Sequence, residues 1–220
     1  MPGHRDAHVR RRHAAALACI TIALATAAAG CGGDEDQAAL RGFTRTPAAH
    51  VGSVGLPDVA PGSAGAPMAF RAGPGELLLA YFGYTTCPDI CPTTLADVRL
   101  ALGRLPAAQR RRVTVAMATV DPERDTPKVL NGYLRHFFST WHALRTTDPA
   151  ALRRAEKPFG ARHEIGPEKA DGDYDVSHTA VLYAVDDAGV VRVEWPFGSA
   201  PEDIAADLRT LLAEQSPAAA

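Results

Sequence analysis

A nearly unbroken apolar run, ELLLAYFGY at residues 76–84, constrains the fold of this chain more than any other segment. Runs of this length are typical of strands that are buried on both faces of a sheet. A second run of the same kind, RVTVAMATV, occupies residues 112–120. Sheets with two buried faces are covered by helices, so these two segments favour an α/β architecture.

A helix is predicted directly after the first strand. Its apolar positions recur at helical spacing, at Leu95, Val98, Leu102 and Leu105. Pro92 fits only the first turn of this helix, because proline has no backbone N–H. A short connection therefore joins the end of this strand to the start of the helix.

Further elements follow along the chain. They are a helix at 126–138, a short strand at 142–144, a helix at 147–158, strands at 179–185 and 190–195, and a final helix at 199–212. Thr126 is placed to cap a helix with Pro127 at its first position. Thr147 or Asp148 is expected to cap the next helix, and Pro158 to stop it. Ser199 and Glu202 have the spacing of a capping box. This order predicts a thioredoxin-like α/β fold, with a central mixed sheet flanked by helices.

The N-terminus resembles an export signal of the lipoprotein type. Four arginines precede an apolar stretch at 14–30 that is rich in small residues and short for a membrane span, and the stretch ends at AAAGC. Cleavage before Cys31 would leave that cysteine to carry lipid. An uncleaved anchor and an Arg-pair export signal are the alternatives, and all three place the folded part outside the cytoplasm.

The predicted organisation has three parts. Residues 1–30 are a lipoprotein-type signal peptide, 31–47 a flexible tether of glycine, acidic and polar residues, and 48–220 the thioredoxin-like domain, which opens with loops and a small hairpin. The formal net charge of −2 argues against a nucleic-acid-binding protein.

The number of cysteines indicates a reactive or metal-binding site rather than a disulfide scaffold. The chain encodes four, of which Cys19 lies in the signal and Cys31 at the lipidation site. Cys87 and Cys91 remain, in the segment CPDICP between the first strand and its helix. A bridge between them would close too small a loop to constrain the unfolded chain much. A redox pair and half of a metal site both fit, and the helix N-terminus predicts thiolate-prone sulfurs.

Of the five histidines beyond the signal, His178 is the candidate partner for the cysteines. It directly precedes the predicted strand at 179–185. If that strand runs antiparallel to the first, the loop bearing His178 meets the cysteines at one edge of the sheet. His136 is interpreted as structural or solvated, and His50, His142 and His163 have no supporting pattern.

Three segments resemble the Sco (SenC) family of copper-binding thioredoxin-like proteins. They are YFGYTTCPDICPTTL, VDPERDTPKVLNGYL and DGDYDVSHTAVLYAVDDAGVV, in the family's order. The resemblance implies a copper site formed by Cys87, Cys91 and His178. Two thiolates favour Cu(I), and the imidazole helps to retain Cu(II). Asp121 and Asp125 are expected to cap a turn and a helix, without a metal role.

The resemblance also implies a membrane-tethered copper metallochaperone at the outer face of the cytoplasmic membrane. Its partner would be the copper-bearing subunit of cytochrome c oxidase or another copper carrier. A thiol–disulfide oxidoreductase acting on that centre's cysteines, with Cys87 and Cys91 as the redox pair, and a redox or copper sensor remain alternatives. This chain has Thr86 and Ser177 where the family often has His and Asp, and Asp173 or Asp175 is the candidate substitute beside His178.

Overall fold

The computed structural model describes residues 39–215. Its strands are β1 (Gly55–Pro57), β2 (Pro67–Ala69), β3 (Leu77–Gly83), β4 (Val113–Thr119), β5 (His142–Leu144), β6 (His163–Ile165), β7 (Val176–His178), β8 (Val181–Val185) and β9 (Val191–Pro196). Its helices are α1 (Ile90–Gly103), α2 (Ala107–Arg110), α3 (Pro127–Leu134), α4 (Pro149–Phe159) and α5 (Pro201–Glu214).

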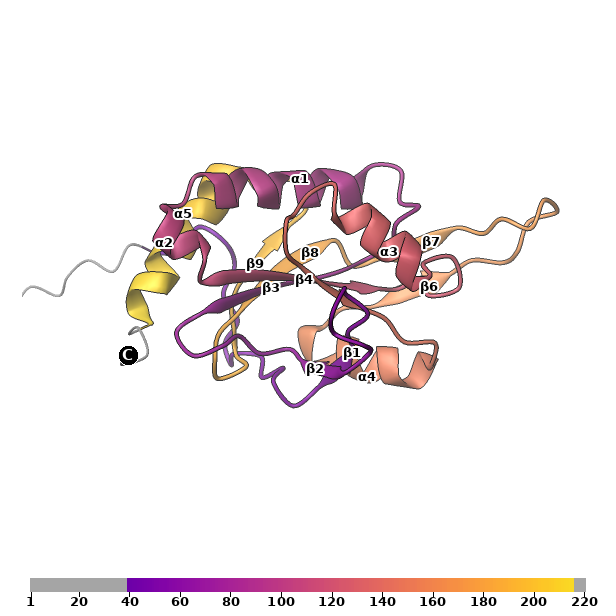
Figure 1. The fold of residues 1–220 in the computed structure, drawn as a ribbon, viewed down its shortest axis with the longest axis horizontal. Helices are drawn as coiled ribbons and strands as arrows, with labels where there is room; N and C mark the ends of the chain where they lie inside the picture. The colour runs from indigo at the N-terminus through magenta and orange to yellow at the C-terminus, as the bar shows by residue number, and fades with distance from the viewer. Residues whose placement is uncertain (1–38, 216–220) are drawn as a thin grey trace, which may run out of the picture. The chain divides into compact units, whose positions relative to one another are not determined.

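A five-stranded mixed sheet with the order β5-β4-β3-β8-β9 forms the centre of the domain. β3 runs parallel to β4, and β4 runs parallel to β5, whereas β8 pairs antiparallel with both β3 and β9. Figure 1 shows α1 and α5 over one face of this sheet, and α4 with the β1–β2 hairpin over the other. The predicted thioredoxin-like fold, with a mixed sheet flanked by helices, is confirmed.

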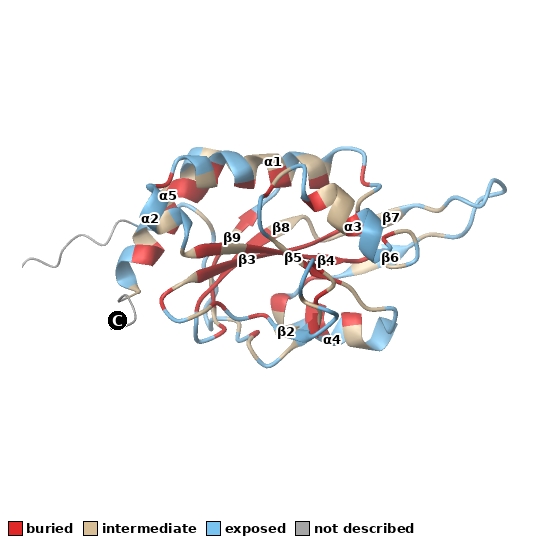
Figure 2. Cartoon of the chain, in the orientation of Figure 1, coloured by how far each residue is buried: buried red, intermediate tan, exposed pale blue. Residues whose placement is uncertain are grey.

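Burial follows the apolar runs of the sequence. Every residue of β3 is buried, and six of the seven residues of β4 are buried with it, because both strands lie inside the sheet under two helical layers. Figure 2 shows this buried centre and the exposed outer sides of the helices. The small hairpin expected before residue 74 is the β1–β2 pair.

The helix ends agree with the predicted caps at two of three sites. The Thr126 side chain accepts a hydrogen bond from the Val129 N–H, and Asp148 caps α4 through Ala150. The expected capping box at Ser199 is wrong. α5 starts at Pro201, with Ala200 at the N-cap and no side-chain cap, while the Ser199 hydroxyl donates to the Pro196 carbonyl.

Pro158 does not stop α4, contrary to the prediction. The helix continues to Phe159 and ends at Gly160, which has a left-handed φ of 69°. Phe159 is fully buried and packs edge-on against Phe70 and Phe82, with ring centroids 5.0 and 5.2 Å apart. This packing favours the extension of the helix to Phe159. Because Pro158 lies near the helix end, it removes only a single backbone hydrogen-bond donor.

Residues 39–47, which we expected to belong to the tether, pack on the domain. The backbone N–H groups of Arg41 and Gly42 donate to the buried carboxylate of Asp207 at 2.8 and 2.9 Å. Phe43 forms an antiparallel bridge to Glu194 beside β9. The signal, Cys31 and the rest of the tether lie outside the described residues. Within 39–215, no helix combines the length and apolar character that crossing a membrane requires.

Candidate metal centre

The two cysteines lie at the connection between β3 and α1. β3 ends at Gly83, Cys87 lies in the connecting turn, and Cys91 is the second residue of α1. The Cys91 N–H donates to the Cys87 sulfur at 3.3 Å, so the sulfur accepts from a backbone donor that the first helical turn leaves free. Both cysteines are free thiols and both are buried.

The antiparallel pairing of β3 with β8 brings His178 to the cysteines. Tyr81, near the end of β3, is paired with Leu182, near the start of β8, and His178 lies three residues before the first residue of that strand. Its Nε2 lies 3.4 Å from the Cys91 sulfur. We expected His178 to lie in a loop, and this is wrong. His178 is the last residue of the short strand β7, which pairs with β6.

The three ligand atoms of Cys87, Cys91 and His178 all lie within 4.8 Å of one another. Among residues 39–215, no other group of three or more His, Cys, Asp or Glu is clustered in this way. Metal bonds to sulfur and nitrogen of about 2.0–2.3 Å put two ligands of one ion at most about 4.6 Å apart. A small movement of side chains therefore lets all three reach a common ion, and the residues present fit copper.

Two tyrosines and one backbone carbonyl fix the imidazole of His178. The rings of Tyr81 and Tyr84 meet it edge-on, with centroids 5.9 and 5.6 Å away. Its Nδ1 lies 3.2 Å from the Thr179 carbonyl oxygen. A proton on Nδ1 satisfies that carbonyl and leaves the Nε2 lone pair facing the sulfurs.

Asp173 and Asp175, the candidate substitutes for the missing carboxylate at position 177, pair with other side chains and not with His178. Asp173 accepts from Arg124 at 2.8 Å, and Asp175 accepts from the Lys169 ammonium at 2.7 Å. The departure at Ser177 is therefore not offset by either carboxylate, and the Thr179 carbonyl is the partner of the ring.

Burial sets the protonation of this site. It raises the pKa of the Cys91 thiol to about 12 and lowers the pKa of His178 below its ordinary value. The expectation of a thiolate-prone Cys91 is therefore wrong for the metal-free domain, because desolvation outweighs the hydrogen bonds from the Tyr84 backbone and the Tyr81 hydroxyl. His178 is neutral at pH 7, which is the form that binds metals.

Gly83 and Tyr81 are part of the site, although neither was predicted from the sequence. The Tyr81 hydroxyl donates to the Cys91 sulfur at 3.5 Å. A Cβ added at Gly83 would lie 2.6 Å from the Tyr81 ring and 3.0 Å from that sulfur. The glycine therefore permits the close approach of strand and cysteine, and a glycine at the end of an apolar strand was the available signal.

The other four histidines among residues 39–215 do not reach the cysteines. His142 bonds to the buried Asp58, with Nδ1 2.7 Å from the carboxylate. His163 bonds in the same way to the buried Glu156 at 2.6 Å. His50 bridges to Val190 through its backbone, and His136 follows α3 on an exposed surface.

Comparison with known proteins identifies the class. The geometry describes a thioredoxin-like domain in which two cysteines and one histidine form a candidate metal site. The family model described as SCO1/SenC matches residues 62–213. The chain belongs to the SCO1/SenC family, and the resemblance seen in the sequence is confirmed.

Three similar proteins illustrate the relationship. A protein of Stutzerimonas stutzeri named as a candidate copper-binding protein is 38% identical over 118 residues, which are 54% of this chain and 57% of that one. The apo Sco1 of Thermus thermophilus is 30% identical with a TM-score of 0.67, covering 79% of this chain and 97% of that one. The copper-bound ScoI of Bradyrhizobium japonicum is 32% identical with a TM-score of 0.60, covering 71% and 95%. The chain spans less than two thirds of the length of the first curated relatives it matches.

Proposed function

We propose that this protein binds copper through Cys87, Cys91 and His178 and delivers it to the copper-bearing subunit of cytochrome c oxidase. The observation that carries the proposal is the cluster of these three ligand atoms within 4.8 Å, in a chain of the SCO1/SenC family. The copper held by the Bradyrhizobium ScoI structure supports the choice of metal.

The ligand set suits a carrier that meets both oxidation states. Two thiolates provide most of the affinity for Cu(I), and the imidazole supplies the nitrogen that Cu(II) favours. His178 is only half-buried, whereas Cys91 is fully buried. We infer that the histidine side is where a recipient reaches the ion, because exchange between proteins needs at least one accessible ligand.

A copper titration followed by transfer tests the proposal. Reduced full-length protein, titrated without oxygen, should bind one Cu(I) tightly, and Cys87→Ser and Cys91→Ser should each lose that binding. Cys31→Ser is the matched control, because it removes a cysteine that the proposed site does not use. Copper from the loaded protein should then appear in a metal-free copper-binding domain of the oxidase subunit. Unchanged affinity in the Cys87→Ser and Cys91→Ser variants, or no transfer, contradicts the proposal.

Thiol–disulfide exchange is a second candidate function. Cys87 and Cys91 are both free, and the Cys87 sulfur accepts from the Cys91 N–H. The pair could therefore reduce a disulfide in the copper-binding cysteines of the recipient, and this function does not need His178. Reduction of such a disulfide at the same rate by wild type and His178→Ala supports it.

We further propose export and lipid attachment at Cys31, which would hold the domain at the outer face of the cytoplasmic membrane. The arginine-rich start, the apolar stretch and AAAGC support this. Mass spectrometry of the native N-terminus should find a diacylglyceryl-modified Cys31 as the first residue. An intact Met1, or cleavage elsewhere, contradicts it.

A further inference from the structure

The loop after β4, residues 120–125, touches both segments that carry the candidate ligands. On the cysteine side it uses Asp125, which is fully buried. This carboxylate accepts from the Thr85 N–H at 3.1 Å and from the Thr119 hydroxyl at 2.6 Å. Thr85 lies two residues before Cys87, so the loop is fixed to the turn that holds the cysteines.

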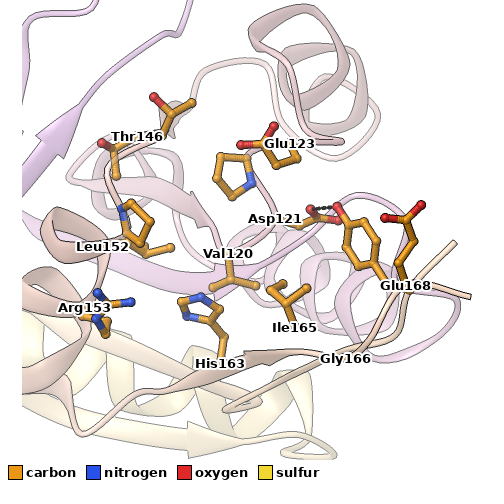
Figure 3. Close-up of a pocket in the computed structure, with 14 residues that line it drawn as sticks. Val120, Asp121, Glu123, Thr146, Leu152, Arg153, His163, Ile165, Gly166 and Glu168 are labelled. Atoms are coloured by element: carbon orange, nitrogen blue, oxygen red, sulfur yellow. Dashed lines mark hydrogen bonds between the residues drawn. The ribbon is translucent and has the colours of Figure 1, made fainter. Parts of the chain in front are cut away.

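On the histidine side the loop uses Asp121 and Arg124. The Tyr174 hydroxyl donates to Asp121 Oδ1 at 2.7 Å, a bond drawn as the dashed line at Asp121 in Figure 3. The Arg124 guanidinium lies 3.9 Å from the centre of the Tyr174 ring and also donates to Asp121 and to the Tyr174 carbonyl. Tyr174 therefore has three contacts with the loop, four residues before His178.

The β6–β7 hairpin depends on such external contacts. Each of its strands has only three residues, and two-stranded hairpins are marginal by themselves in water. β6 is bound to α4 through His163 and Glu156, at 2.6 Å. β7 is held by the Tyr84 hydroxyl, which donates to the Val176 carbonyl at 3.0 Å, and by the contacts of Tyr174.

We propose that Tyr174, held by Asp121 and Arg124, is a positioning residue that places His178 against the cysteine pair for Cu(II) binding. Asp121 is almost fully buried and sits on the loop that Asp125 fixes to the cysteine turn. The bond from Tyr174 to Asp121 thus fixes the hairpin in the frame of the cysteines. This inference rests on the proposed copper function.

The test compares Tyr174→Phe with Lys169→Ala. The first variant removes only the hydroxyl that reaches Asp121. The second removes the exposed ion pairs of Lys169 with Asp175 at 2.7 Å and with Asp173 at 3.9 Å, in which both partners belong to the same hairpin. Partners that orient metal ligands are typically worth about 10- to 100-fold in metal affinity. We expect Tyr174→Phe to lower Cu(II) affinity about tenfold and to shift the sulfur-to-Cu(II) charge-transfer band, with Cu(I) affinity changed less than about threefold.

A measurement on the metal-free protein separates failure of this inference from failure of the copper function. Amide hydrogen exchange at 176–179 should be faster in Tyr174→Phe than in wild type, and unchanged in Lys169→Ala, whether or not copper binds. The inference is overturned if Tyr174→Phe leaves the exchange, the Cu(II) affinity and the spectrum unaltered. In that case, copper binding by the wild type leaves the proposed function standing. Equal losses of Cu(I) and Cu(II), or the same loss in Lys169→Ala, also overturn it.

Discussion

The sulfur of Cys91 and Nε2 of His178 lie 3.4 Å apart, although 87 positions separate them in the chain. The pairing of β3 with β8 explains this contact, because antiparallel strands bring the end of one beside the start of the other. α1 starts at that same edge and carries Cys91 in its first turn. The antiparallel direction of the two strands therefore brings the candidate ligands together, and no long loop has to close over them.

Oxidation of the cysteine pair should abolish tight Cu(I) binding. The two sulfurs lie within 4.8 Å, so a modest movement forms a bond of about 2.05 Å. A disulfide consumes both soft ligands, which leaves His178 alone. Oxidised and reduced protein should be titrated with Cu(I) without oxygen or reductant. Equal affinities in the two states would show that the sulfurs are not the principal ligands.

Asp58 should make stability depend on pH in the acid range. Burial favours its neutral form, but hydrogen bonds from His142, Ser63 and the amides of Ala60 and Ala143 more than offset this and lower the pKa of Asp58 below its usual 3.8. The stabilisation is present above that value and is lost as the pH falls through the lowered pKa. Asp58→Asn should cost about 1–3 kcal/mol at pH 7, and the difference from wild type should narrow below about pH 4.

Asp148→Asn is the control for this experiment. Asp148 caps α4 on an exposed surface, and asparagine caps helices about as well, so we expect a change below about 0.5 kcal/mol. Urea unfolding from pH 2 to pH 7 gives both values. A difference between Asp58→Asn and wild type that stays constant over this range would contradict the assigned role of the Asp58 carboxylate.

Asp207 should stabilise the domain without affecting the metal centre. Its buried carboxylate accepts from the backbone of Arg41 and Gly42 and from the Trp195 indole at 2.9 Å. Asp207→Ala leaves these donors without a partner and should cost about 2–4 kcal/mol. Asp203→Ala, which removes an exposed pair with Arg41, should cost less than about 1 kcal/mol. Thermal unfolding gives the comparison, and similar losses in the two variants would be inconsistent with this account.

The sequence alone was enough to predict the elements that form the centre of the fold. The apolar runs ending at Tyr84 and Val120 are typical of strands with both faces covered, and the proline behind each cysteine marks the strand-to-helix connection. Thr126 was recognisable as a cap because the proline after it presets the helical φ. These signals are local, so one sequence suffices to read them.

What remained hidden depends on partners distant in the chain. β6 and β7 have three residues each and no apolar run, so neither has a detectable period. The carboxylate of Asp121 looked like a turn cap, because nothing in the sequence places Tyr174 beside it. The raised pKa of Cys91 follows from full burial, which helix-dipole reasoning does not include.

The central claim is that copper is held by three ligands, and His178→Ala tests it most directly. Copper on Cys87 and Cys91 alone would be two-coordinate, which Cu(I) tolerates, whereas Cu(II) prefers more donors, including nitrogen. Dithiol–disulfide exchange needs only the cysteines. His136→Ala is the matched control, because that histidine lies outside the cluster.

The measurement is the Cu(II) affinity of wild type, His178→Ala and His136→Ala, made beside the Cu(I) affinity and the reduction potential of the cysteine pair. The account predicts that His178→Ala loses Cu(II) affinity by at least about 100-fold, with a smaller loss for Cu(I) and a nearly unchanged potential. A His178→Ala variant that keeps its Cu(II) affinity but shifts strongly in potential would contradict the three-ligand copper site and favour the oxidoreductase.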